Sequence, residues 1–203
     1  SLESNMLKYV ALVAAIATTS AFAAPTTSPL YVTAGGGEAK FKNACDIQVG
    51  SCEDTDTTFR VGVGLQMQDN MSFEINYLDH GKATDNFENG AFFDRYSAEA
   101  QTIALQFSAT APVSEMMGLY GKVGLAHTQS TLSNQFNDSL SSGSVSEDGK
   151  ETGLIVSAGI GFNFAPNLSA QFQLDYLPDA IKSDAVNFDT DIQSYSVGLK
   201  FNF

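Results

Sequence analysis

The sequence is poor in charged residues, poor in cations and without a long apolar run. Only 16% of its 203 residues are charged, whereas about a quarter is usual for a soluble globular domain. No stretch reaches the roughly 20 apolar residues of a membrane-spanning helix, although 43% of all residues are hydrophobic. The apolar residues are therefore distributed over short segments, within a length typical of one domain.

Cations and cysteines are both scarce. The few cations argue against nucleic-acid binding, and the few cysteines argue against a metal site. Ten lysines and arginines face 23 aspartates and glutamates, so the formal net charge is -13. Without a basic patch we expect no nucleic-acid partner. The two cysteines, Cys45 and Cys52, do not have C-x-x-C spacing and have no histidine nearby. We expect them to form a disulfide in an oxidising compartment, and we expect no metal and no cofactor.

The beginning of the chain has the pattern of a secretory signal peptide. Met6 and Lys8 open a short basic region, an apolar core follows, and Ala21-Phe22-Ala23 fits a cleavage site. Residues 1–5 precede this pattern and are interpreted as a cloning remnant or a mis-assigned start. The alternative for this stretch is a buried N-terminal helix. We assign 1–23 to the remnant plus signal peptide, and 24–203 to one domain.

Eight segments of the remaining chain alternate apolar and polar residues, which is the period of a β-strand. In 71–77, for example, Phe73, Ile75 and Tyr77 share one face while Ser72, Glu74 and Asn76 share the other. The expected strands are 31–41, 59–67, 71–77, 101–109, 119–129, 154–164, 168–176 and 195–203.

The connections between these segments alternate in length. Short connections are expected at 68–70, 111–116 and 165–167, and long polar loops at 42–57, 79–95, 130–150 and 178–190. This order places all long loops at one end of an up-and-down barrel. Outer-membrane barrels have the same asymmetry, with tight periplasmic turns and longer extracellular loops.

The composition of the two strand faces favours a membrane barrel over a soluble, lipocalin-like one. The apolar face carries no charge across the middle of most strands, as lipid contact requires. The polar face is rich in small residues, which suit the crowded interior of a barrel of about eight strands. Aromatic residues gather toward strand ends, and each segment is near the length of a tilted membrane strand. With no helical span, only a closed barrel can pair every backbone group in lipid.

Two short motifs carry a resemblance to a known family. Ser196, Gly198, Phe201 and Phe203 resemble the terminal signal that the barrel-assembly machinery recognises, and 30–37 resembles an aromatic, glycine-rich first strand. From about 31 to 203 the chain resembles the OmpA-like small outer-membrane β-barrel family. The resemblance implies an eight-stranded antiparallel up-and-down transmembrane barrel. The resemblance does not extend to the peptidoglycan-binding domain that some members carry, so we expect no cell-wall anchoring.

Five charged residues fall on the face expected to point into the barrel. They are Arg60, Glu74, Lys122, Asp175 and Lys200. Because buried charges must be paired, we expect an ion-pair network that plugs the barrel, as in OmpA-like domains. The alternative is a narrow ion pathway that opens when the pairs rearrange.

Catalytic and nucleotide-binding patterns are weak. His80 and His127 are expected near the outer strand ends, in acidic loops, as solvated bystanders. The His127 segment lacks the His-x-Ser-Asn arrangement of small barrels that deacylate lipid A. The run Gly35-Gly36-Gly37 lacks the Lys-Ser/Thr and the helix of a phosphate loop. We therefore expect no enzymatic activity.

The sequence favours a non-enzymatic surface protein with a plugged barrel, long acidic extracellular loops, and a structural role with adhesion or colonisation through the loops. The alternatives are a narrow channel and a lipid-modifying enzyme. The expected location is the bacterial outer membrane with extracellular loops. The expected partners are membrane lipid and lipopolysaccharide, the barrel-assembly machinery, and a host surface or matrix ligand, with the barrel itself a monomer.

Overall fold

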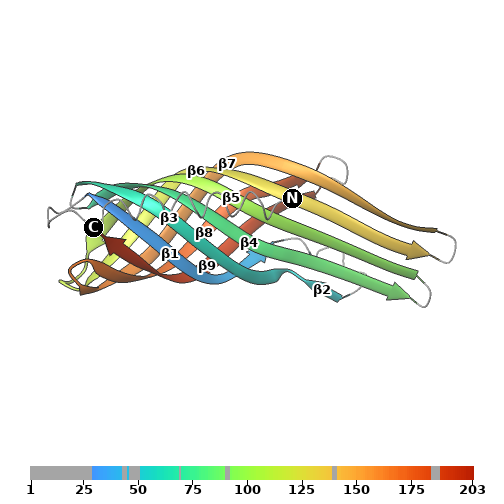
Figure 1. Cartoon of the computed structure of the whole chain (residues 1–203), viewed down its shortest axis with the longest axis horizontal. Coiled ribbons are helices and arrows are strands. Elements are labelled where there is room, and N and C mark those ends of the chain that lie inside the picture. Colours follow the sequence, from blue (N-terminus) through green and yellow to red (C-terminus); the bar gives the residue numbers. More distant parts are fainter. Residues whose placement is uncertain are drawn as a thin grey trace.

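Eight long strands close into one antiparallel barrel (Figure 1). The computed structural model describes residues 29–42, 45, 51–68, 70–89, 92–138, 141–183 and 188–203, so the expected signal segment lies outside the described residues. Neighbouring strands are adjacent in the chain, and β1 pairs with β9 to complete the ring. The expected eight-stranded up-and-down barrel is therefore confirmed.

The strands are longer than a membrane requires. The barrel strands are β1 (Leu30–Phe41), β3 (Thr55–Gln68), β4 (Met71–Asn89), β5 (Phe92–Pro112), β6 (Met117–Asp138), β7 (Ser141–Ala165), β8 (Leu168–Ser183) and β9 (Phe188–Asn202), and a short β2 (Ser51–Glu53) lies beside β4. We call the end with the three short connections the turn end. The opposite end, where β4–β5 and β6–β7 continue as paired strands, is the hairpin end. The described part of the chain contains no helix long and apolar enough to cross a membrane.

An apolar band surrounds the half of the barrel nearer the turn end. The outward side chains there are apolar, and many of them are at least 41% exposed, among them Leu65, Phe73, Ile75, Ile103, Leu105, Leu125, Val156, Leu174, Val197 and Leu199. Tyr176 and Tyr195 lie toward its hairpin-end border, and Phe162 and Phe201 toward the turn end. An exposed belt of this kind is stable only against hydrocarbon, with aromatic residues at its two borders.

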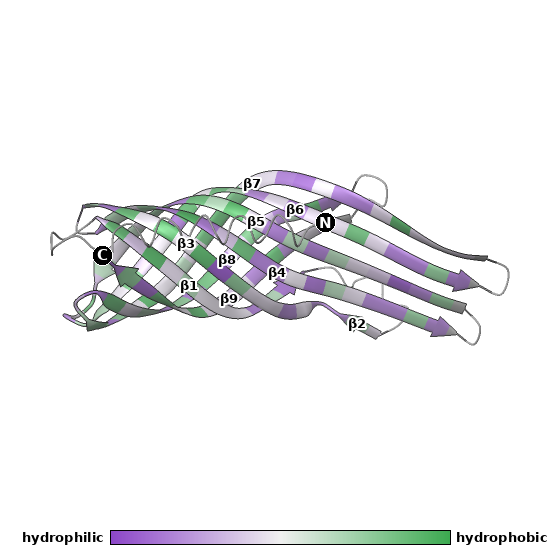
Figure 2. Ribbon diagram, viewed as in Figure 1, coloured by the Kyte–Doolittle hydropathy of each residue, from purple (hydrophilic) through white to green (hydrophobic). Residues whose placement is uncertain are grey.

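Beyond the band, the expected loops 79–95, 130–150 and 178–190 are mostly strand, so that part of the sequence interpretation is wrong. Residues 79–95 and 130–150 belong mostly to the hairpins β4–β5 and β6–β7, whose ladders continue to Asn89↔Phe92 and Asp138↔Ser141. These ends are predominantly hydrophilic (Figure 2). Both faces of the extended strands meet water there, so the apolar alternation that marks a half-buried strand disappears.

Bulges bend two strands just beyond the band. The β4–β5 register shifts between Asp79 and Lys82, and Gly81 there has a φ of 70°. The Gly81 N–H donates to the Asp79 carboxylate over 2.9 Å. The β8–β9 register shifts between Leu177 and Ile181, around Asp179 with a φ of 49°. Such bulges re-aim the chain where the barrel leaves its regular part.

The two cysteines form a cross-link at the hairpin end. Cys45 and Cys52 form a disulfide, which confirms the expected pairing. Cys52 lies in β2, which pairs with residues Thr84 to Asn86 of β4. The bond therefore holds a short extra strand against one edge of the β4–β5 hairpin.

Candidate functional site

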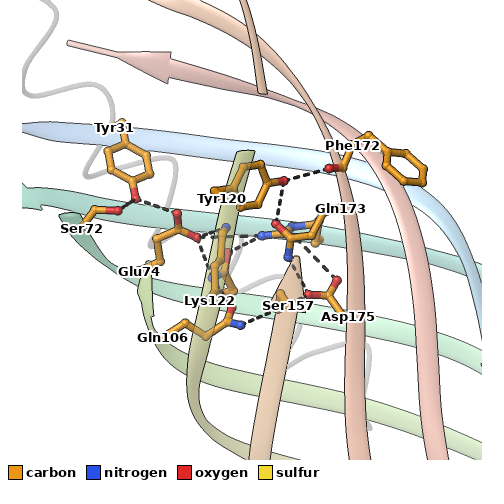
Figure 3. A network of polar contacts seen from close by, with 12 residues as sticks. Tyr31, Ser72, Glu74, Gln106, Tyr120, Lys122, Ser157, Phe172, Gln173 and Asp175 are labelled. Carbon is orange, nitrogen blue, oxygen red and sulfur yellow. Dashed lines mark hydrogen bonds and ion pairs between the residues drawn. The ribbon is translucent and has the colours of Figure 1, made fainter. Parts of the chain in front are cut away.

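The barrel interior holds a buried polar network near its middle (Figure 3). Its four charged members are Arg60, Glu74, Lys122 and Asp175, on β3, β4, β6 and β8, and each is at most 6% exposed. They point inward because they share strand parity with the small polar residues of the same face. Strand closure thus brings together four of the five charges that the sequence places inside.

Glu74 is the centre of one half of this network. Its carboxylate accepts from Lys122 Nζ over 2.5 Å and from the Tyr31 hydroxyl over 2.7 Å. The Arg60 guanidinium lies 4.0 Å from the same carboxylate. Asn76 donates to it over 3.2 Å. The Glu74 charge is therefore paired with two cations and held by neutral donors.

Asp175 is the centre of the other half. Its carboxylate accepts from Ser157 and from Gln173, each over 2.6 Å, and lies 3.6 Å from Arg60. Gln106 connects the halves because it accepts from Asn76 over 3.1 Å and donates to Ser157 over 2.8 Å. Two cations and two carboxylates thus balance in one network that crosses the barrel.

Lys200 does not join the ion pairs. Its Nζ lies 3.7 Å from the centroid of the Tyr31 ring, a cation–π contact. Tyr31 in turn donates to Glu74, so the Tyr31 ring links Lys200 to the network. The cavity beside Arg60, Gln171 and Gln173 holds about 10 Å³, about the space of one water molecule.

A second interior layer lies toward the hairpin end and is mainly apolar. Counted from the turn end, Leu78 follows Glu74 on β4, Leu177 follows Asp175 on β8, and Ile155 lies beyond Ser157 on β7. These side chains are at most 2% exposed and pack in one cluster with Phe41, Ile181, Ile192 and several alanines. The sequence interpretation missed this layer, although continued strand parity would have placed Leu78 and Leu177 inside.

The extended hairpins form a four-stranded sheet, which we call the hairpin sheet. It consists of 82–89, 92–99, 131–138 and 141–148. Its outer face is polar: Arg95 donates to Asn86 over 2.6 Å, and Thr131 to Asp148 over 3.0 Å. Its inner face, on the side of the buried Ala83 and Ala98, is more apolar and aromatic, with Tyr96, Leu132, Phe136 and Val145.

Tyr96 is the polar centre of that inner face. Tyr96 lies between Arg95 and Ser97 of β5, and its ladder partners are Asp85 of β4 and Asn134 of β6. Partial burial and the neighbouring Asp94 carboxylate raise the pKa of Tyr96, so the phenol stays neutral and can donate to an acceptor.

Comparison with known proteins identifies the family of this barrel. The family model described as "Outer membrane protein beta-barrel domain" matches residues 9–203. The chain belongs to this family. Its fold is that of the small eight-stranded outer-membrane barrels of the OmpA-like kind, which confirms the resemblance seen in the sequence. A search of curated proteins found no match.

Solved outer-membrane barrels share the fold at low sequence identity. Ail, the attachment invasion locus protein of Yersinia pestis, is 17% identical, with 87% of this chain and 99% of that chain covered and a TM-score of 0.50. Neisserial surface protein A is 15% identical, with coverages of 88% and 100% and a TM-score of 0.54. The N-terminal barrel of Pseudomonas aeruginosa OprF is 13% identical, with the same coverages and TM-score.

Three residues of the resembled assembly signal, Ser196, Gly198 and Phe201, lie on β9, and the fourth, Phe203, directly follows it. Gly198 lies opposite Gly35 of β1, and a Cβ built on Gly198 would come 2.9 Å from the Gly35 Cα. The rings of Phe201 and Phe203 meet edge to face at 5.3 Å. Ser196 is buried inside. Recognition of these residues by the assembly machinery remains a prediction.

The two histidines lie on opposite sides of the barrel wall. His80 is fully buried inside, 3.0 Å from the Thr102 hydroxyl, so its assignment to a solvated loop is wrong. His127 faces outward, is exposed, and contacts Thr152 over 2.9 Å. They cannot share one catalytic site. Among the described residues, no group of histidine, cysteine and acidic side chains is arranged to hold a metal ion.

Proposed function

We propose that this outer-membrane barrel is a sealed, non-enzymatic anchor that displays the hairpin sheet outside the cell for contact with a macromolecule. The observation that carries the proposal is the continuation of four paired strands beyond the apolar band. A strand pair that only closed the barrel would need no such length, because about 9–11 residues cross a membrane. Surfaces on rigid scaffolds commonly carry recognition.

The filled interior supports the anchor over a channel. The polar network balances its own charges, and a packed apolar layer fills the barrel between the network and the hairpin end. A small barrel filled in this way does not conduct. Planar-bilayer recordings of the purified protein should show no stable conductance steps, and large steps would contradict the sealed barrel.

The short connections and the borders of the band support the orientation. Outer-membrane barrels keep tight turns on the periplasmic side and long connections outside. The hairpin end would then face a host surface or matrix, and the band would face lipid and the membrane part of lipopolysaccharide. Protease added to intact cells should cleave at the hairpins and leave the band intact.

Shortening the hairpins tests the contact role. The variant lacks 84–96 and 132–147, each replaced by a short turn, and keeps every strand within the band. Cells that display it should lose adhesion to cultured host cells or immobilised matrix while the barrel stays folded and heat-modifiable in gels. Unchanged adhesion at equal surface amounts would contradict the proposal.

A further inference from the structure

The two edges of the hairpin sheet differ. On the β4 edge, β2 pairs with Thr84 to Asn86 and is fixed by the Cys45–Cys52 disulfide. On the β7 edge, the ladder to β8 ends at Val156↔Tyr176. Among the described residues, no strand pairs with β7 on that side above Val156, and Figure 1 shows β7 as the outermost strand.

Within the part of the chain that the structure describes, the stretch of this edge without a partner strand is 142–148. Nearer the band, the end of β8 lies close to β7, because a Cβ built on Gly153 would be 3.7 Å from the Pro178 carbonyl and one on Gly149 would be 3.8 Å from the Lys182 carbonyl. Beyond that point every residue from Ser142 to Asp148 is exposed, whichever face it points to, and Val145 reaches 63%. An edge of this kind presents a row of unpaired N–H and C=O groups.

We infer that this edge, which we call the β7 edge (142–148), binds an extended, positively charged peptide segment of a partner protein by adding it as a further strand. The inference rests on the proposed contact role of the hairpin sheet and names the chemistry of the contact. Main-chain hydrogen bonds would supply affinity, and side-chain pairs across the new ladder would supply selectivity.

Charge selects the partner. Glu147 and Asp148 lie at the β7 edge, and no ion pair is formed by either within the described residues. Opposite charges across a strand pair stabilise it, and like charges destabilise it. A strand that carries lysine or arginine is therefore favoured over a neutral or acidic one.

A second copy of this chain is a poorer occupant. In one membrane, a neighbouring barrel would present β7 in the same direction, with its own Glu147 and Asp148 beside these two. The net charge of -13 adds repulsion between copies. A partner of opposite charge satisfies the same backbone groups without this cost.

Pairing at the β7 edge can be blocked by a substitution that leaves the hairpin sheet intact. Alternate residues of β7 direct their N–H groups to β6 or to the free edge, so one of the two variants Ser144→Pro and Val145→Pro deletes only an edge donor. The variant of this pair that keeps the gel shift and the β6–β7 amide protection is the edge variant. The charge variant is Glu147→Gln with Asp148→Asn, and Glu88→Gln at the tip of β4 is its control.

Binding is measured with the full chain in phosphatidylcholine nanodiscs. The probes are a ten-residue peptide of alternating lysine and valine, and its glutamate counterpart. We expect the lysine peptide to bind, to slow hydrogen exchange at 142–148, and to bind about tenfold more weakly to the edge variant and to the charge variant. The Glu88→Gln control should bind normally. Equal binding of both peptides, unchanged binding to the edge variant, protection elsewhere, or dimerisation through β7 would overturn the inference.

Cell-adhesion measurements on the hairpin-shortened variant and the edge variant distinguish a failure of this inference from a failure of the proposed contact role. If the hairpin-shortened variant loses adhesion while the edge variant keeps it, the contact role stands and the β7 edge is not the contact. If the shortened variant keeps adhesion, the proposed function itself fails. Loss of adhesion in both variants supports both.

Discussion

The two halves of the barrel interior are filled by different chemistry. Toward the turn end, Arg60, Glu74, Lys122 and Asp175 pair inside a wall surrounded by the apolar band. Toward the hairpin end, Leu78, Ile155 and Leu177 pack with other apolar side chains inside a wall whose outer face becomes polar. Polar side chains thus fill the interior where the outer face is apolar. Apolar side chains fill it where the outer face becomes polar.

The difference shows what each filling contributes. Apolar packing is non-directional. It therefore excludes water from the barrel but does little to favour one strand register over another. Hydrogen bonds and ion pairs work only at fixed distances, so a satisfied buried network favours one arrangement of the strands. A slip of one residue would turn Glu74 toward lipid and Ile75 into the interior.

The largest expected effect comes from breaking the polar half at Glu74. Glu74→Gln leaves Lys122 without its 2.5 Å partner, and removal of one member of a buried pair costs about 3–5 kcal/mol. The double variant Glu74→Gln with Lys122→Met removes both charges and should recover most of this loss. Because the chain has no tryptophan, the gel shift between folded and unfolded forms in urea is the measurement.

Equal stability of the single and double variants would contradict the pairing. Arg60 and Asp175 remain balanced in the double variant, 3.6 Å apart, so no new unpaired charge is created. The comparison therefore isolates the Lys122 charge from a general effect of altering the interior.

The sequence predicted the half inside the band better than the rest, for a physical reason. Lipid outside and polar filling inside impose alternation, so 71–77 could be assigned as a strand with its faces. The same parity continues to His80, which is buried, but the outward apolar residues end at Tyr77 and the signal ends with them. In the hairpin sheet both faces meet water, and the serine-rich 130–150 resembles a loop.

Pairing partners were not predictable in the same way. Alternation places Glu74, Lys122 and Lys200 inside but does not fix which of them meet, since tilt and register decide which strands bring their charges level. Lys200 was assigned to the ion pairs and instead stacks on Tyr31. Tyr31, Asn76, Gln106 and Ser157 were not singled out, because neutral residues join a network only through geometry.

A smaller effect is expected from the apolar half. Leu177 is 1% exposed in the apolar cluster, so Leu177→Ala opens a cavity there and costs about 3 kcal/mol. Leu174→Ala, on the same strand, is the matched control because Leu174 is 50% exposed on the lipid side. Its loss should be well below that of Leu177→Ala in the same urea titration. Equal losses would show that the inner layer is not packed as a core.

The smallest effect on the barrel, and a local one on the hairpin sheet, is expected from the disulfide. Cys45→Ser with Cys52→Ser should change the free energy of unfolding of the barrel, measured in urea, by no more than about 0.5 kcal/mol, because the β2 ladder to β4 has three residue pairs beyond the apolar band. Hydrogen exchange at Thr84 to Asn86 should instead accelerate, since β2 is no longer held there. The untouched Ser133 and Ser146 pair, 3.3 Å apart in the β6–β7 hairpin, serves as the internal control. Faster exchange there as well would mean that the disulfide stabilises the whole sheet, so that its two edges depend on one another.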